Sequence, residues 1–250
     1  KAAKEVHYWG HFPVADMEFE TDAPVRVSLR AWAPFIPGDS VASNTPAAVF
    51  EVGLRNATSQ AQQGALAFNF PGPDAQEANA TEFTREAIDE DDFCGLLVSS
   101  TGGVGYALGT IGTDHLRIGG GLGGESTAWA EIADELPQPA FGEHQGSRLY
   151  QDASSSAAVD FSLEPGEEKT VRFLLAWYAP VWEGAHKDYV DTIVTGATNE
   201  WRGSSQSDAI NYYTHMYAAR YESALDVARH VAVEHESLLS RVLAWQSVIY

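Results

Sequence analysis

Three segments of this sequence carry residue types whose spacing could support chemistry. The first is the glycine run at residues 119–124, which satisfies the pattern G-x-G-x-x-G and precedes a helical segment. In a dinucleotide-binding unit the backbone amides of such a run cradle a pyrophosphate, and an acidic residue follows about 20 positions later, after a second strand. Pro137, Pro139 and Gly142 occupy that region instead. We therefore interpret the run as a flexible loop and predict no cofactor.

The second segment, residues 230–235, holds the ingredients of a zinc-binding helix in the wrong order. His230 and His235 are five positions apart, which separates them by about 140° around a helix, so they do not converge on one ion. His230 and Glu234 are expected to form an exposed pair instead. The sequence predicts no metal ligands here.

The third segment is the acidic run at residues 89–92, which could offer oxygen ligands to calcium. It lacks the spacing of an EF-hand, so a solvated acidic loop is the preferred interpretation.

Glycoside hydrolysis would need two opposed carboxylates, about 5–5.5 Å apart in retaining enzymes. With 35 Asp and Glu residues, spacing along the chain selects no such pair, and no catalytic residue is predicted.

Aromatic side chains are a further class of candidate. Trp182 and Trp201 fall in irregular segments, where exposed rings could stack on sugars, so both are candidate carbohydrate contacts. They could equally be buried against a neighbouring domain. Trp177 is in phase with apolar strand positions and is expected in the core. Cys94 is the only cysteine; it lies in an apolar run and is expected to be a small buried hydrophobe rather than a nucleophile.

The elements that must position these residues are mostly strands. Apolar and polar residues alternate over several short segments, which is typical of half-buried strands. These segments are residues 25–31, 50–55, 66–70, 159–163 and 171–177, with shorter apolar runs at 93–99 and 106–111. Strands separated by Gly, Pro, Asn and Asp, without helical crossovers, predict an antiparallel β-sandwich. Pro165-Gly166 between two alternating segments predicts a hairpin turn.

Helical spacing occurs in two places. Residues 125–136 carry an apolar stripe at i, i+3, i+4 and i+7 and stop at Pro137, which predicts one short helix inserted in the sandwich. Residues 204–250 contain no Gly or Pro, and their apolar stripe predicts two helices or one bent helix. We therefore predict a β-sandwich domain at residues 1–182 and a helical linker region at residues 183–250.

The charge balance excludes several classes of partner. Thirty-five acidic residues against 15 basic ones give a formal net charge of −20, which repels phosphate backbones and anionic lipids. No nucleic-acid partner is therefore expected. Membrane insertion is not expected either, because no stretch reaches the length of an apolar span. Only four of the basic residues are lysines. This pattern favours a protein kept soluble in concentrated salt; an ordinary acidic protein is the alternative.

Four stretches together resemble glycoside hydrolase family 116, which includes non-lysosomal glucosylceramidases, β-glucosidases and β-xylosidases. They are residues 7–20 running on to 30–39, residues 45–52, residues 170–178, and the helical ending at 217–245. The block at residues 31–38, AWAPFIPG, is the most specific part. The resemblance implies the family's N-terminal β-sandwich domain, followed in the parent protein by an (α/α)6 barrel.

In that family the barrel supplies a Glu nucleophile and an Asp acid/base for retaining hydrolysis of β-glucosides. No residue of this sequence matches the motif around either carboxylate, so the chain alone is expected to be inactive. The Gly-rich segment at the start of family members is also absent, which implies that the first strands of the sandwich are missing. The expected partners are the catalytic domain of the same protein and, in the parent enzyme, a neutral β-glucoside.

The resemblance leads to a functional hypothesis with two alternatives. The chain is expected to pack on the catalytic barrel and shape its substrate cleft; it could instead bind carbohydrate or serve structure and assembly alone. The resemblance and the charge pattern together lead us to expect that the protein is located in the cytoplasm of a salt-adapted prokaryote. A leader removed from the N-terminus remains compatible with a chain that begins at Lys1.

Overall fold

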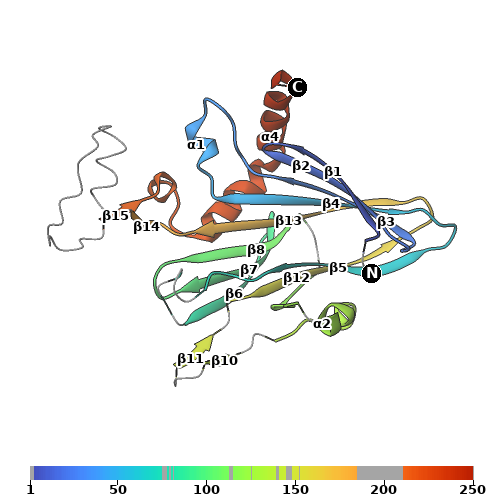
Figure 1. Cartoon of the computed structure of the whole chain (residues 1–250), viewed down its shortest axis with the longest axis horizontal. Helices are drawn as coiled ribbons and strands as arrows, with labels where there is room; N and C mark the ends of the chain where they lie inside the picture. Colours follow the sequence, from blue (N-terminus) through green and yellow to red (C-terminus); the bar gives the residue numbers. More distant parts are fainter. Residues whose placement is uncertain are drawn as a thin grey trace, which may run out of the picture.

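Two β-sheets stacked face to face form the body of the protein, with one long helix against the outer face of the larger sheet (Figure 1). The computed structural model describes residues 3–74, 78, 80, 82–112, 115–124, 126–138, 141–144, 148–151, 153–184 and 211–249. This arrangement confirms the predicted mainly β, antiparallel sandwich followed by a C-terminal helix.

The larger sheet has eight antiparallel strands. In spatial order they are β1 (Glu5–His11), β2 (Val14–Glu20), β3 (Val25–Trp32), β4 (Ala47–Asn56), β13 (Glu168–Tyr178), β8 (Gly105–Ile111), β7 (Phe93–Ser100) and β6 (Phe83–Asp89). The smaller sheet has the order β5 (Gln62–Phe70), β12 (Ser155–Leu163) and β9 (Leu116–Gly120). Two short pairs complete the described strands: β10 (Phe141–His144) with β11 (Arg148–Gln151), and β14 (Val181–Gly184) with β15 (Asn211–Thr214).

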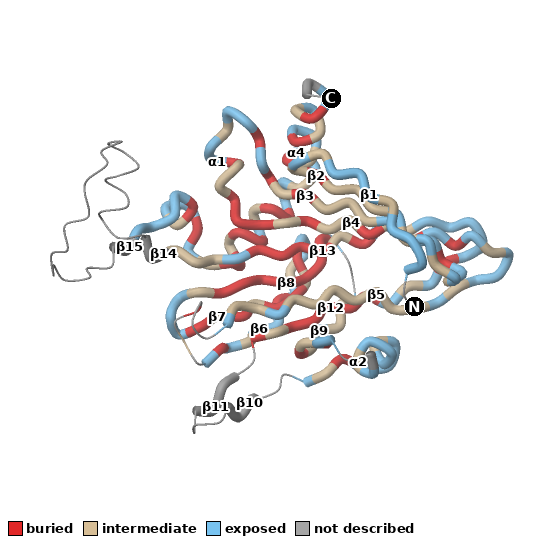
Figure 2. Tube along the Cα trace, viewed as in Figure 1, coloured by how far each residue is buried: buried red, intermediate tan, exposed pale blue. Residues whose placement is uncertain are grey.

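The sandwich core lies between the two sheets and follows the alternation seen in the sequence. Phe68 of β5 packs between Phe50 and Phe173, with ring centroids 4.7 and 5.6 Å apart. Val171, on the same face of β13 as Phe173, is fully buried. The buried residues run through the centre of both sheets in Figure 2. Period-two alternation is therefore a sound guide to this core.

A second apolar layer forms where α4 (Ala224–Ile249) crosses the outer face of the large sheet. Leu174 of β13 and Val49 of β4 contribute from the sheet, and Val227, Val231 and Val242 contribute from the helix; all five are fully buried. Strand β13 is thus apolar on both faces over residues 173–176. The helix covers only part of the outer face, chiefly over β13, β8 and β7.

Two predictions about helices need correction. The inserted helix α2 covers only Ser126–Glu131, and Trp129, which was expected on its apolar face, is 41% exposed. Within residues 211–249, the described part of this region, there is neither a second α-helix nor a break within α4. Residues 211–214 form β15 and pair with β14, and a 3-10 helix η1 (Met216–Ala219) precedes one continuous α4. A short helix α1 (Ser40–Ser43), capped by Asp39, is additional.

The Pro165-Gly166 turn exists but does not form a hairpin. Gly166 has φ of +78°, and the Glu167 amide donates to the Glu164 carbonyl at 3.0 Å, so the local turn chemistry is as predicted. The strands on either side belong to different sheets, because β12 pairs with β5 and β9 whereas β13 pairs with β4 and β8. The turn carries the chain from one sheet to the other.

The glycine run is a loop only over residues 121–124. Its first residues end strand β9, where close packing excludes a side chain. A Cβ on Gly119 would lie 2.5 Å from the Leu136 Cβ, and one on Gly121 would lie 2.0 Å from the Ser154 Oγ.

Trp177 was expected in the core and is a further correction. Its side chain lies on the same face of β13 as the core residues, but it is 41% exposed because it stands at the end of the strand.

Candidate functional site

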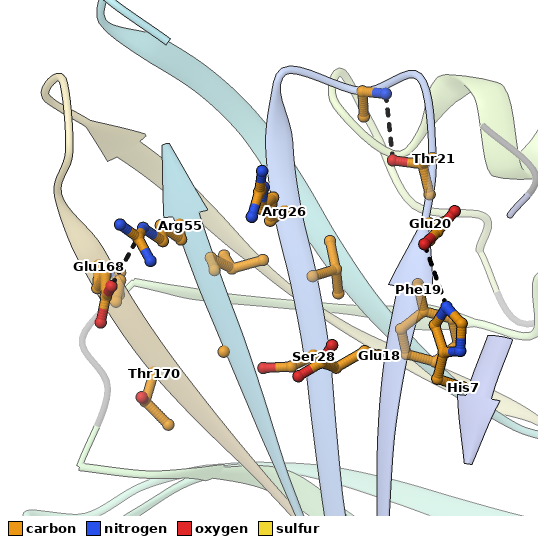
Figure 3. A pocket seen from close by; sticks show the side chains of 15 residues that line it. His7, Glu18, Phe19, Glu20, Thr21, Arg26, Ser28, Arg55, Glu168 and Thr170 are labelled. Carbon is orange, nitrogen blue, oxygen red and sulfur yellow. Dashed lines mark hydrogen bonds and ion pairs between the residues drawn. The ribbon is translucent and has the colours of Figure 1, made fainter. Parts of the chain in front are cut away.

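The part of the large sheet that α4 leaves open carries a polar groove. Cross-strand rows of side chains run over one face of the sheet, through β1, β2, β3, β4 and β13. One of these rows forms the floor of the groove. That row consists of His7, Glu18, Ser28, Gly53 and Thr170. We call the hollow above it the outer-face groove (Figure 3).

The shape of the groove follows from side-chain size. The middle of the floor row is made of small residues, Ser28, Gly53 and Thr170. The neighbouring rows, two positions along each strand, carry long side chains that form the two walls. One wall contains Glu20, Arg26, Arg55 and Glu168, and the other contains Trp9, Asp16, Arg30 and Glu51.

The dimensions of the groove follow from sheet geometry. Four inter-strand steps separate β1 from β13, which gives a length of roughly 19 Å, and the two walls lie roughly 13 Å apart. Two adjoining hollows of about 620 and 540 Å³ share Glu18, Ser28, Gly53 and Thr170. Ligand sites in proteins occupy about 300–1,000 Å³, so the space is sufficient for a ligand of several sugar rings.

Ion pairs hold several of the long wall side chains in place. The Arg30 Nε donates to the Asp16 Oδ1 at 2.8 Å, and this hydrogen bond raises the pKa of Arg30. On the opposite wall the Arg55 Nε lies 3.3 Å from the Glu168 Oε1. Both pairs are partly or fully exposed and contribute little to stability. Their effect is to fix where the charged groups stand along the groove.

His7 stands at the β1 end of the groove, hydrogen-bonded to Glu20. The His7 Nε2 lies 3.1 Å from the Glu20 Oε1, and this contact, with the nearby charges of Glu5 and Glu18, raises the pKa of His7 above its ordinary value of 6.5. Glu5 and Glu20 face each other across the β1–β2 ladder. The ligand atoms of Glu5, His7 and Glu20 lie within 4.8 Å of one another, so these residues are the group among the described ones that could hold a metal ion.

A second surface feature lies where the C-terminal part of α4 meets the β1–β2 turn. Phe12 is 67% exposed, and its ring centroid lies 5.0 Å from that of Phe35, which in turn lies 6.3 Å from that of Trp245. We call Phe12, Phe35 and Trp245 the aromatic cluster. The Gln246 Nε2 donates to the His11 carbonyl beside it, so helix and turn are joined at this point.

The side chains of the two aromatic residues predicted as carbohydrate contacts lie outside the part of the chain that the structure describes. Trp182 lies on strand β14, opposite Tyr213 of β15, but its side chain is outside the described residues. Trp201 lies outside the described residues altogether. Trp9, which sequence reasoning missed, is an exposed aromatic residue of the groove, whose lining also includes Phe19. The available signal was its position in phase with the polar residues His7 and His11.

The acidic run, the histidine segment and Cys94 make structural contacts. Glu90 of the acidic run accepts a paired hydrogen bond from Arg229 of α4, with the Arg229 Nη2 2.6 Å from the Glu90 Oε1, and this lowers the pKa of Glu90. His230 is half-buried rather than fully exposed, and burial lowers its pKa, followed by the charge of Arg220. Cys94 is only partly buried, and its thiol contacts the Asp89 carboxylate at 3.4 Å.

Comparison with protein families decides the identity of the fold. The sequence model of the family described as "beta-glucosidase 2, glycosyl-hydrolase family 116 N-term" matches residues 1–238. This chain belongs to glycoside hydrolase family 116. The match covers the sandwich and most of α4, so the predicted membership in the family's N-terminal domain is confirmed. A catalytic domain is the partner that this membership implies.

Solved structures give more distant likenesses to this family 116 domain. A protein described as a kojibiose phosphorylase from the human microbiome matches with a TM-score of 0.31 and 10% identity, covering 66% of this chain and 17% of that chain. Heparinase III with methylated lysines matches with a TM-score of 0.36 and 12% identity, covering 74% of this chain and 24% of that chain. The chain thus spans less than a quarter of either protein, and no curated protein sequence matches it.

In the described part of this family 116 domain, no helix combines the length and the apolar character that crossing a bilayer requires.

Proposed function

We propose that this family 116 domain is the accessory N-terminal part of a retaining β-glucosidase of the glucosylceramidase type, and that it packs on an (α/α)6 catalytic domain and shapes one wall of the substrate cleft. The observation that carries the proposal is the family match over residues 1–238. The substrate of the whole enzyme is then a neutral β-glucoside, and the chain by itself does not hydrolyse it.

The aromatic cluster supports a packing role and is the surface we assign to the catalytic domain. Phe12 and Phe35, with Val41 at 52% exposure on α1, present apolar surface next to α4. Exposed apolar groups that gather in one place mark interaction sites more often than singly scattered ones do.

The first test separates an accessory role from catalysis. The chain, the catalytic domain encoded with it, and an equimolar mixture are assayed on an aryl β-glucoside. We expect background turnover for the chain alone and higher turnover for the mixture than for the catalytic domain alone. Hydrolysis by the isolated chain would contradict the proposal.

The second test addresses the packing surface. A Phe12→Ser, Phe35→Ser variant is expected to weaken association with the catalytic domain by at least about tenfold, because aromatic anchors dominate interface energies. Trp129→Ala is the matched control, since Trp129 is also exposed but lies on α2, in another part of the molecule. Equal affinities of the two variants, measured by calorimetry, would remove the aromatic cluster from the interface.

Trp182 and Trp201 remain our proposal for carbohydrate contacts beside the cleft. Their rings are the kind of flat surface on which sugars stack. If they act in this way, Trp182→Ala and Trp201→Ala in the assembled enzyme raise the KM for the β-glucoside and leave kcat nearly unchanged. We also propose that the protein works in the cytoplasm of a salt-adapted prokaryote, which the salt dependence described below tests.

A further inference from the structure

We propose that the outer-face groove binds a neutral oligosaccharide, at a site separate from the aromatic cluster. This inference goes beyond the proposed packing role, because it gives the domain a ligand of its own. It rests on the hydrogen-bonding groups, charge balance, aromatic platform and shape of the groove.

Hydrogen-bonding groups in the groove are unengaged. Glu18 of β2, Arg26 and Ser28 of β3, and Thr170 of β13 are all exposed. Within the described structure none of these four side chains makes a hydrogen bond or an ion pair, in contrast to the paired Arg30 and Arg55 of the walls. Together these side chains offer a carboxylate, a guanidinium and two hydroxyls along the groove. Vicinal hydroxyls of sugars are suited to such alternating donors and acceptors.

The charge balance of the groove favours a neutral ligand. Its lining contains five acidic residues, Asp16, Glu18, Glu20, Glu51 and Glu168, and four basic residues, Arg26, Arg30, Arg55 and Lys169. Over the whole chain acidic residues outnumber basic ones by 35 to 15. The groove is therefore close to neutral in an otherwise strongly acidic protein, so its field offers no attraction to a polyanion.

Trp9 supplies the aromatic platform. It is 49% exposed on β1, at one end of the groove, and its ring stacks on that of His7 with centroids 6.2 Å apart and an interplanar angle of 30°. The stacked neighbour limits how the indole can turn, which lowers the entropy lost when a ligand covers it. An exposed indole ring held in this way presents an apolar face to the carbon side of a pyranose.

Gly53 keeps the centre of the groove open. A Cβ at this position would lie 2.5 Å from the Ser28 Oγ and would fill the floor between Ser28 and Thr170. The backbone of Gly53 does not have a positive φ, so its conformation would accept a side chain. A glycine here weakens a strand interior, and such positions often mark close approach of a ligand or another backbone.

The experiment is a calorimetric titration of the full chain with cellotetraose, xylotetraose and maltotetraose. We expect at least one of these neutral tetrasaccharides to bind, and glucose to bind more weakly than the tetramer because it spans only part of the groove. Trp9→Ala and Gly53→Val should each weaken that binding by about tenfold or more, while circular dichroism shows that they remain folded. Because Trp9 is exposed on an edge strand, its removal leaves the core intact.

Tyr8→Ala is the matched control. Tyr8 is 62% exposed on the same strand but points to the other face of the sheet, so this variant should bind with unchanged affinity. Absence of binding by all three tetrasaccharides at millimolar concentration would overturn the proposal, as would an equal loss in Trp9→Ala and Tyr8→Ala. If the groove variants instead weaken association with the catalytic domain and no sugar binds, the groove is a protein interface. Neither result alters the hydrolysis test of the packing role.

Discussion

Asn56 shows how one buried polar side chain holds a junction of the sandwich. It is fully buried at the end of β4, and its Nδ2 donates to the carbonyls of Gln60, Leu163 and Glu164 at 2.8, 3.0 and 3.1 Å. Its Oδ1 accepts from Thr58, which belongs to the same Asn-Ala-Thr sequon. The amide that a glycan would need is therefore already used inside the protein.

Replacing this side chain should be costly. We expect Asn56→Ala to lower the free energy of unfolding by about 2–4 kcal/mol, because it leaves several buried carbonyl groups without donors. Asn44→Ala is the control, since Asn44 makes a single side-chain hydrogen bond to the Ser40 carbonyl at 2.7 Å and should cost about 1 kcal/mol or less. Urea unfolding of both variants measures the difference, and equal losses would contradict the role given to Asn56.

His7 provides a test of groove electrostatics at a single residue. Its pKa is raised chiefly by the hydrogen bond to Glu20, so an NMR titration should place it above 6.5, and Glu20→Gln should bring it down. A raised histidine pKa stabilises the fold below the unfolded value of about 6.5, and this contribution disappears as the pH rises through the folded pKa. An unchanged midpoint in Glu20→Gln would show that the contact does not form in solution.

At the scale of elements, α4 owes its position to one apolar stripe. Leu238 is 5% exposed and faces the sheet, whereas Val233 on the same helix is 62% exposed. The paired contacts of Arg229 with Glu90 and of Arg241 with Asp39 lie at the margins of this stripe. Such exposed ion pairs orient the helix but add little to its stability.

The two helix positions give a matched prediction. Leu238→Ala should lower the free energy of unfolding by about 2–5 kcal/mol, because it removes a buried side chain and leaves a cavity. Val233→Ala should change it by less than about 0.5 kcal/mol. Thermal or urea unfolding measures both, and a small effect at Leu238 would mean that α4 is not packed on the sheet as described.

For the whole molecule, the net charge of −20 predicts a strong dependence on salt. Self-repulsion between exposed carboxylates is screened over about 3 Å at 1 M salt but over about 30 Å at 0.01 M. The midpoint of thermal unfolding should therefore fall by several degrees from molar to low KCl. A variant with glutamine or asparagine at the exposed, unpaired positions Glu86, Asp91, Glu131 and Glu135 should show a smaller fall. Constant stability at low salt would exclude the salt-adapted interpretation.

The sequence by itself determined the strand content, the sandwich class and the family. Alternation over β3, β4, β12 and β13 is a local signal, since successive side chains of a strand point to opposite faces whatever its partners are. The family signature is likewise carried by short contiguous stretches. Even the polar face of the future groove was visible as the alternating Arg26, Ser28 and Arg30.

Only the tertiary structure decided which strands are neighbours. The groove needs Gly53 of β4 beside Thr170 of β13, a pairing between residues more than one hundred positions apart. Sequence reasoning placed β12 and β13 in one hairpin because their turn is locally correct, but the packing of two sheets separates them. Turn geometry and alternation depend on a few adjacent residues. Strand order depends on how the whole chain buries its apolar faces, and that decides which small side chains line up to form a groove.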